Sequence, residues 1–218
     1  MIDNQEMSFL IPRTLHGSII GIKNSLRDVS LVSAIRRGQD DEAERFQVHR
    51  SIIFVITPMK KIQFSAEYSV FQDEKELSEA DFQLLQAAKA ATKTAYAPYS
   101  NFKVGAAVLL ENGVVVPGSN QENAAFPVTI CGERNAVFAA AAQHPGIAVL
   151  KVAITVETKS QNMTKPVPPC GSCRQVLFEY ESRYNQNIQL ILQGDSGEVY
   201  MVDSIKDILP LLFDASFL

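Results

Sequence analysis

The chain has 218 residues, of which 46% are hydrophobic and 20% are charged. These proportions are typical of one soluble globular domain, with or without an appendage. No apolar run approaches the roughly 18 residues needed to cross a bilayer, so a membrane-spanning protein is excluded. The net charge of -4 argues against long nucleic acids and anionic membranes as partners, and favours a small polar molecule. A basic groove within this acidic average is the alternative.

The first 58 residues differ from the remainder of the chain. They carry seven basic and seven acidic side chains, they contain none of the three cysteines, and no motif in them indicates a chemistry. Met59 is followed by two lysines and by an alternating segment, 62–71, that is typical of an edge strand. We therefore expect the native product to begin at Met59. The alternative is that residues 1–58 are a genuine N-terminal extension of unknown role before a functional domain at 59–218.

A regular pattern of helices and strands begins at Ser78. Ser78 is a helix-capping residue with Asp81 three positions later, and apolar residues at helical spacing then predict a helix to about Ala95. Two valine-rich runs, 102–110 and 114–118, are joined by Asn112-Gly113 and predict a hairpin. The remaining pattern predicts helices at 131–143, 171–184 and 204–212, and strands at 148–156, 188–192 and 199–202. A sheet layered with helices, an α/β fold, is the result.

All three cysteines lie in two short motifs. Cys131 begins Cys-Gly-Glu-Arg, and Cys170 and Cys173 belong to Pro-Cys-Gly-Ser-Cys-Arg-Gln. Three cysteines are too few and odd in number for a disulfide framework, which favours a reducing, cytoplasmic compartment. Thiolates are ligands that zinc prefers, and both motifs fall at predicted helix starts. Because three protein ligands leave a fourth position for water, the motifs predict a catalytic zinc ion.

Two other interpretations of the cysteines remain open. In a structural zinc site a histidine would complete the ligand set, but His144 is about 18 Å from Cys131 along the predicted helix, and His16 and His49 lie in the first 58 residues. In a metal-free redox pair, Cys170 and Cys173 would act together. That alternative leaves Cys131 and the neighbouring carboxylate of Glu133 unexplained.

Two charged residues follow Cys131. Glu133, in the first turn of the predicted helix, is a candidate proton shuttle beside the metal, although a glutamate at a helix start is commonly only a partner of the helix dipole. Three thiolates give a zinc ion a formal charge of 2 - 3 = -1, which would make its bound water harder to ionise. Arg134 is expected to offset this charge by donating hydrogen bonds to sulfur, unless it is a surface arginine.

These motifs resemble those of the cytidine deaminase family, in its free-nucleoside, homo-oligomeric form, since zinc deaminases combine a ligand-x-Glu motif with a later Pro-Cys-x-x-Cys. The resemblance covers roughly residues 78–213. It implies a layered α/β/α fold around a central mixed sheet and one Zn2+ per subunit. It also implies a homotetramer that acts in pyrimidine salvage in the cytoplasm.

Three further stretches carry the same resemblance and imply substrate contacts. Phe102 corresponds to a phenylalanine that packs against the pyrimidine, and Asn120 and Glu122 correspond to residues that bind the ribose hydroxyls. Phe213, or with less support Phe217, corresponds to an aromatic residue that reaches the active site of a neighbouring subunit. The match departs from the family pattern at two positions: Gly132 replaces the usual alanine but keeps the implied backbone N–H, and Phe126 replaces a common tyrosine.

The implied reaction is the hydrolysis of cytidine or deoxycytidine to uridine or deoxyuridine with release of ammonia. Glu133 would take a proton from water, give it to N3 of the ring, and later protonate the departing amino group. Three alternatives remain at this point: a deaminase of another aminopyrimidine nucleoside such as blasticidin S, a zinc-stabilised binding module without turnover, and a polynucleotide editor.

Overall fold

The computed structural model describes residues 60–158 and 162–218, so the expectations for residues 1–58 and for a start at Met59 lie outside the described residues. All of the described residues belong to one unit of the chain, Met59–Leu218. None of its described helices combines the length and the apolar character that a membrane span requires.

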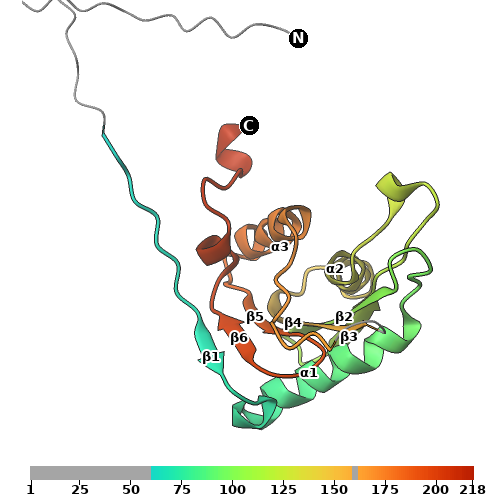
Figure 1. The fold of residues 1–218 in the computed structure, drawn as a ribbon. Helices are drawn as coiled ribbons and strands as arrows, with labels where there is room; N and C mark the ends of the chain where they lie inside the picture. Colours follow the sequence, from blue (N-terminus) through green and yellow to red (C-terminus); the bar gives the residue numbers. More distant parts are fainter. Residues whose placement is uncertain (1–59, 159–161) are drawn as a thin grey trace, which may run out of the picture. The chain divides into compact units, whose positions relative to one another are not determined.

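A six-stranded sheet forms the centre of this unit, with the strands in the order β1, β6, β5, β4, β2, β3 (Figure 1). Strands β4 and β5 are parallel and the other neighbours are antiparallel, which confirms the mixed sheet. The strands are β1 Ser69–Phe71, β2 Phe102–Leu110, β3 Val115–Ser119, β4 Val149–Thr158, β5 Gln189–Gln193 and β6 Val199–Val202.

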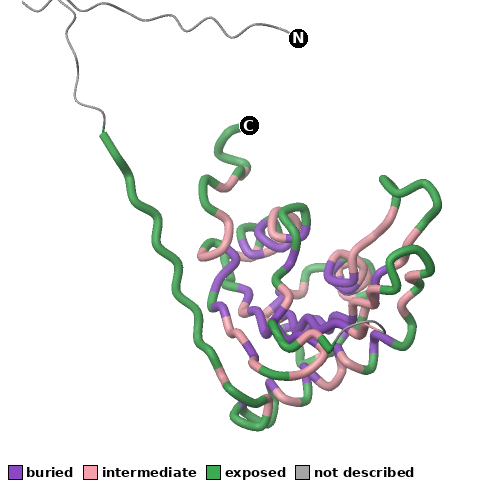
Figure 2. The backbone as a smooth tube through the Cα atoms, in the orientation of Figure 1, coloured by how far each residue is buried: buried purple, intermediate pink, exposed green. Residues whose placement is uncertain are grey.

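Helices cover both faces of the sheet, as a layered α/β/α fold requires. Helix α1, Glu79–Ala91, lies on one face, and helices α2, Gly132–Gln143, and α3, Gly171–Tyr184, lie on the other (Figure 1). Successive residues of a strand point to opposite faces. Ala107 of β2 therefore packs in the core with α1, and Val108 packs in the core with α2 and α3. Figure 2 shows that buried residues are concentrated in the central strands and on the helix faces that meet them.

Most of the predicted elements are confirmed by the structure. The Ser78 side chain accepts a hydrogen bond from the Asp81 backbone N–H at 3.2 Å, which caps α1 as expected. Strands β2 and β3 form the predicted hairpin, and Gly113 in its turn has φ of +82°. The structure also confirms the predicted bounds of β2, α3 and β6.

The edge strand and the first helix are shorter than expected. The edge strand predicted at 62–71 is reduced to the three residues of β1, because its partner β6 has only four residues to pair with. Helix α1 ends at Ala91 and continues as a 3-10 turn, Thr92–Thr94, where the Thr92 hydroxyl bonds to the Lys89 carbonyl.

The helix predicted at 204–212 is wrong in length and in type. A 3-10 helix, Ile205–Ile208, takes its place, with Ser204 as the capping residue as expected. Leu209 leaves the helical conformation because it precedes Pro210, whose ring disfavours a helical residue before it. The chain after Ile208 therefore continues as a C-terminal tail, which contains a short 3-10 helix at Ala215–Phe217.

Candidate active site

The three cysteine thiols meet where helices α2 and α3 begin. Cys131 is the capping residue of α2, Cys170 is the capping residue of α3, and Cys173 lies in the first turn of α3. The Sγ atoms of Cys131 and Cys170 are 4.0 Å apart, and those of Cys170 and Cys173 are 3.4 Å apart. All three sulfur atoms lie within 4.8 Å of one another. Residues 39 positions apart in the sequence thus form one cluster of sulfur atoms.

Glu133 is buried beside these thiols. It lies in the first turn of α2 and is only 5% exposed. Burial raises the pKa of its carboxyl, and the negative charge of Cys131 adds to the effect. A carboxyl with a raised pKa is suited to accepting a proton in one step and donating it in the next.

Arg134 lies against the same cluster. Its Nη2 donates to Cys131 Sγ at 3.8 Å and to the Thr129 carbonyl at 3.3 Å. The pKa of Cys131 is lowered to about 5, first by a hydrogen bond from Cys173 and further by the hydrogen bond and charge of Arg134, while burial opposes the shift. Arg134 therefore favours the thiolate form that a metal requires.

A cavity of about 360 Å³ opens over the thiols and the Glu133 carboxyl. This volume lies in the range of pockets that hold small molecules. Phe102, Asn120 and Glu122 line it together with Cys131, Cys170 and Glu133. A larger hollow of about 570 Å³ between α1 and β3 is lined by small and neutral side chains and holds no titratable group. We therefore assign the site to the smaller cavity.

Asn120 and Glu122 belong to the part of the cavity lining that is built on loops. The buried Asn120 amide is bonded to the backbone of β2: Oδ1 accepts from the Val104 N–H at 2.8 Å, and Nδ2 donates to the Phe102 carbonyl at 2.9 Å. The Glu122 carboxylate accepts from the Ser100 hydroxyl at 2.5 Å and from the N–H groups of Tyr99 and Ser100 at 2.9 and 3.3 Å. The Ser100 hydroxyl is the largest cause that lowers the pKa of Glu122; desolvation opposes it, and the two backbone N–H groups lower the pKa further.

Comparisons with known proteins agree with this geometry. The family model described as "Cytidine and deoxycytidylate deaminase zinc-binding region" matches residues 78–185. A cytidine deaminase of Halalkalibacterium halodurans is 39% identical over 132 residues, which cover 61% of this chain and 92% of that protein. The chain belongs to the cytidine deaminase family.

Two further cytidine deaminases support this assignment. The enzyme of Sporosarcina psychrophila is 42% identical over 117 residues, which cover 53% of this chain and 79% of that protein. The crystal structure of the cytidine deaminase from Burkholderia pseudomallei has 41% sequence identity and a TM-score of 0.53, and the match covers 60% of this chain and 97% of that one. The α/β fold expected from the sequence is confirmed by this structural match.

The thiol cluster fits the zinc ion of a cytidine deaminase. A tetrahedral site with Zn–S bonds of about 2.3 Å places sulfur atoms about 3.8 Å apart, and the measured separations of 3.4 and 4.0 Å lie on either side of that value. The zinc-binding region at 78–185 contains all three cysteines. The protein therefore binds zinc, one ion per subunit.

No fourth cysteine, histidine or carboxylate joins this cluster within residues 60–158 and 162–218. His144 ends α2, at the opposite end of the helix from Cys131. His16 and His49 lie outside the described residues. Among the described residues, the ligand set is the open one expected of a catalytic site rather than the closed one of a structural site.

Gly132 and Phe213 occupy very different places. Gly132 is buried at the start of α2, where an added Cβ would lie 3.1 Å from the Val104 carbonyl oxygen. Phe213 is 54% exposed in the C-terminal tail, stacks on Phe217 at 5.5 Å between ring centroids, and does not line the cavity of its own chain. The roles expected for these residues and for Phe102, Asn120, Glu122 and Arg134 remain predictions.

Two residues directly after Cys173 have contacts that the sequence did not indicate. Arg174 Nε donates to the Pro169 carbonyl and Nη1 donates to the Ile208 carbonyl, each at 2.8 Å. Gln175 Nε2 donates to the Phe213 carbonyl at 2.8 Å. The first turn of α3 thus holds both the residue before Cys170 and the C-terminal tail. The Arg-Gln pair after the last cysteine was the available signal, but its partners are up to 38 positions away.

Proposed function

We propose that this protein hydrolyses cytidine and deoxycytidine to uridine and deoxyuridine and releases ammonia. One observation carries the proposal: a single cavity is lined by two sets of groups, namely a buried carboxyl with two of the three clustered thiols, and polar groups suited to a sugar. A nucleoside has this same division, with the reacting amino group on the base and the hydroxyls on the ribose. The related proteins of H. halodurans and S. psychrophila, both named cytidine deaminases, support the same substrate.

Glu133 moves the protons of the reaction. It accepts a proton from the attacking water and delivers it to N3 of the ring as a C–O bond forms at C4. It then delivers the second proton of that water to the amino nitrogen as the C–N bond breaks, so that water and cytidine give uridine and ammonia. Bound zinc supplies Lewis-acid chemistry that makes water a nucleophile near neutral pH.

The remaining residues hold the substrate in position. The Gly132 backbone N–H donates to the base carbonyl, and Phe102 packs against the pyrimidine ring. At the sugar end, the Asn120 amide has a second N–H beyond the one bonded to Phe102, and the Glu122 carboxylate has about four acceptor positions for three donors. One donor and one acceptor thus remain for the ribose hydroxyls.

The test is a spectroscopic assay with zinc-loaded protein. Mixing with cytidine should remove the absorbance band of cytidine at a rate proportional to enzyme concentration, and ammonia should appear in equal amount. Repeating the assay with residues 59–218 alone tests whether this segment is the functional domain. An unchanged spectrum with fully zinc-loaded protein would reject the proposed activity.

A deaminase of another aminopyrimidine nucleoside, such as blasticidin S, is the nearest alternative. A substrate panel that includes cytidine, deoxycytidine and blasticidin S separates the two, because the proposal requires the highest kcat/KM with the first two compounds. A larger value for blasticidin S would overturn the substrate assignment while leaving the deaminase chemistry intact.

The proposal includes a homotetramer that acts in cytoplasmic pyrimidine salvage. Three free thiols in one cluster support a reducing compartment. The exposed ring of Phe213, away from the cavity of its own chain, supports a role in the active site of a neighbouring subunit.

Mixed oligomers test the proposed sharing of Phe213 between subunits. Glu133→Gln and Phe213→Ala subunits should each be weakly active alone. In an oligomer that contains both variants, some active sites combine the intact Glu133 of one subunit with the intact Phe213 of its neighbour. The activity of the mixed oligomer should therefore exceed that of either variant alone. Activity equal to the average of the parents would reject sharing, and sedimentation gives the number of subunits directly.

A further inference from the structure

The segment that leads to Cys170 rests on a turn between β5 and β6. We name residues 162–169 the strap and residues 194–197 the seat. We propose that the seat is a positioning device for the active site: it fixes the strap, and through the strap it sets the place of Cys170 and of one wall of the cavity. The inference rests on the proposed function and assigns a role to residues that otherwise only reverse the direction of the chain.

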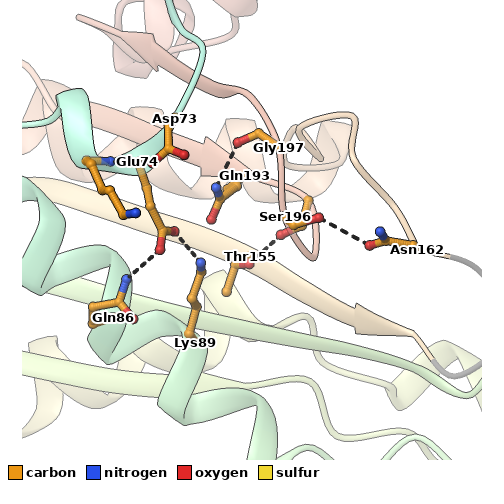
Figure 3. Close-up of polar contacts among 11 residues, drawn as sticks. Asp73, Glu74, Gln86, Lys89, Thr155, Asn162, Gln193, Ser196 and Gly197 are labelled. Carbon is orange, nitrogen blue, oxygen red and sulfur yellow. Dashed lines mark hydrogen bonds and ion pairs between the residues drawn. The ribbon is translucent and has the colours of Figure 1, made fainter.

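Hydrogen bonds join the strap to the seat. The backbone N–H of Asp195 donates to the Met163 carbonyl at 2.7 Å. The Ser196 hydroxyl donates to Asn162 Oδ1 at 3.2 Å, a contact drawn in Figure 3. Backbone and side chain thus both connect two segments that are more than 30 positions apart in the sequence.

Two glycines of the seat bring the backbones this close. A Cβ atom on Gly194 would lie 2.1 Å from the Met163 carbonyl oxygen, and one on Gly197 would lie 2.7 Å from the Thr164 carbonyl oxygen. Both distances are well below a van der Waals contact, and the atoms in the way are backbone atoms that cannot rotate aside. Any other residue at either position must therefore displace the strap or the seat.

The seat itself is held firmly by buried side chains. The Thr155 hydroxyl of β4 donates to the Gly194 carbonyl at 2.7 Å, and Gln193 Nε2 donates to the Gly197 carbonyl at 2.9 Å (Figure 3). Both side chains belong to residues that are 1% exposed. Because the seat is fixed to the core of the sheet, an added Cβ is expected to move the strap rather than the seat.

The strap can transmit such a displacement to the site. It contains Pro166, Pro168 and Pro169, whose rings fix their own φ angles and restrict the residues before them. Val167 and Pro168 line the cavity, and Cys170 follows directly. A stiff segment of this kind carries a shift at Met163 or Thr164 toward the cavity wall and the metal ligand.

Two glycines with matched backbones give a test. Gly197 has φ of +86° and Gly146 has φ of +84°, so Gly197→Ala and Gly146→Ala introduce the same backbone strain. Nothing lies within 4 Å of a Cβ on Gly146, whereas one on Gly197 meets the strap. Both variants carry this strain, and Gly197→Ala adds the contact with Thr164, so Gly197→Ala should lose at least as much thermal stability as Gly146→Ala. Only Gly197→Ala should alter the site.

Two readouts separate positioning from stability. We expect Gly197→Ala to raise the KM for cytidine about tenfold, and to speed zinc release to a chelator by about tenfold, which is the range for residues that support metal ligands. Gly146→Ala should stay within about twofold of the wild type in both readouts. Equal KM values and equal zinc-release rates in the two variants would overturn the inference.

A second variant keeps the test decisive if the effect of Gly197→Ala is small. Gly194 does not have a positive φ, so Gly194→Ala adds the closer contact with Met163 without this strain. We expect it to exceed Gly197→Ala in both readouts, and wild-type zinc release in folded Gly194→Ala protein would refute the role of the seat. If the wild type fails to convert cytidine, the proposed function is wrong. The zinc-release rates of the variants still test whether the seat positions Cys170.

Discussion

The cavity lining has two parts that are built on different principles: the metal end, formed by the cysteines and Glu133, and the proposed sugar end, formed by Asn120 and Glu122. At the metal end, Cys131, Cys170 and Cys173 are attached to the starts of two helices, and Glu133 is buried beside them. At the sugar end, Asn120 and Glu122 lie after the end of β3 and are held by hydrogen bonds to neighbouring backbone. Local geometry at a helix start fixes each side chain of the metal end on its own helix, whereas each side chain of the sugar end is held by hydrogen bonds to segments 16 or more positions away.

The metal end and the sugar end differ in how many of their polar groups remain available to bind a ligand. The thiols contact one another and Arg134, so a metal ion satisfies a set of groups that the fold has brought together. The amide of Asn120 and the carboxylate of Glu122 already take part in two and three hydrogen bonds. Substitutions at the metal end should therefore remove chemistry, and substitutions at the sugar end should change the shape of the cavity and the binding of substrate.

Removal of a metal ligand should have the largest effect. In Cys170→Ala the cluster keeps two thiols, too few for a stable zinc site, and we expect zinc to be lost together with activity, by at least about 10³-fold. Cys170 is exposed, so the fold should survive the change. Metal analysis and the cytidine assay on the same sample check the prediction. Stoichiometric zinc in this variant would mean that the three thiols are not the ligand set.

Two glutamates that line the cavity, one buried beside the thiols and one bonded to the 99–100 backbone, give the next comparison. Glu133→Gln cannot transfer protons, so we expect kcat to fall by about 10²–10⁴-fold while zinc stays bound. Glu122→Gln keeps the side-chain shape but weakens a charge-assisted contact with the 99–100 backbone, so we expect KM to rise about tenfold with kcat little changed. Steady-state kinetics and metal analysis separate the two outcomes. A similar fall of kcat in both variants would contradict the division into two ends.

Asn120 tests whether the sugar end depends on the backbone contacts of the amide. Asn120→Asp places a carboxylate oxygen where Nδ2 now donates to the Phe102 carbonyl at 2.9 Å. Because two acceptors would then face each other in a partly buried place, we expect a loss of about 1–3 kcal/mol in the free energy of unfolding and a higher KM. Chemical denaturation measures the first and kinetics the second.

Asn123→Asp is the matched control for Asn120→Asp. The exposed Asn123 uses only Oδ1, which accepts from the Ala125 N–H at 2.9 Å, and aspartate keeps that acceptor. Its free energy of unfolding should stay within about 0.5 kcal/mol of the wild type. If both variants lose the same stability, the added negative charge rather than the Phe102 contact is responsible.

The metal end was more predictable from the sequence than the sugar end, for a physical reason. A helix start has a local signature: the Ser78 side chain caps α1 within one turn, as the sequence predicted. The helices predicted after Cys131 and Cys170 also begin where the local pattern placed them. The hydrogen bonds of Asn120 to β2 and of Gln175 to the C-terminal tail join segments 16 or more positions apart, and no local pattern encodes them.

The same reasoning explains the elements that were wrong. The alternation of apolar and polar residues at 62–71 predicted a long edge strand. The length of an edge strand also depends on its partner strand, and β6 has only four residues. The helix predicted at 204–212 failed for a reason that was visible in the sequence, since Pro210 disfavours a helical conformation at Leu209.

Among the substitutions considered, Gly132→Ala should have the smallest effect. It separates the contribution of the backbone N–H at this position from the contribution of the space around it. The proposed role of Gly132 belongs to the backbone N–H, which Gly132→Ala keeps. Alanine favours the helix by about 0.5–1 kcal/mol over glycine, while its Cβ would lie 3.1 Å from the Val104 carbonyl oxygen and 3.2 Å from Val104 Cγ1. The Cγ1 atom can move by a few tenths of an ångström, whereas the carbonyl is held in β2 by the Asn120 N–H.

The two effects on Gly132→Ala are opposed and of similar size. We therefore expect the free energy of unfolding to change by less than about 1 kcal/mol and kcat/KM by less than about threefold. Denaturation and steady-state kinetics measure both. A fall in kcat/KM as large as that of Glu133→Gln would show that the space at this position, rather than its N–H, determines how the base enters the cavity.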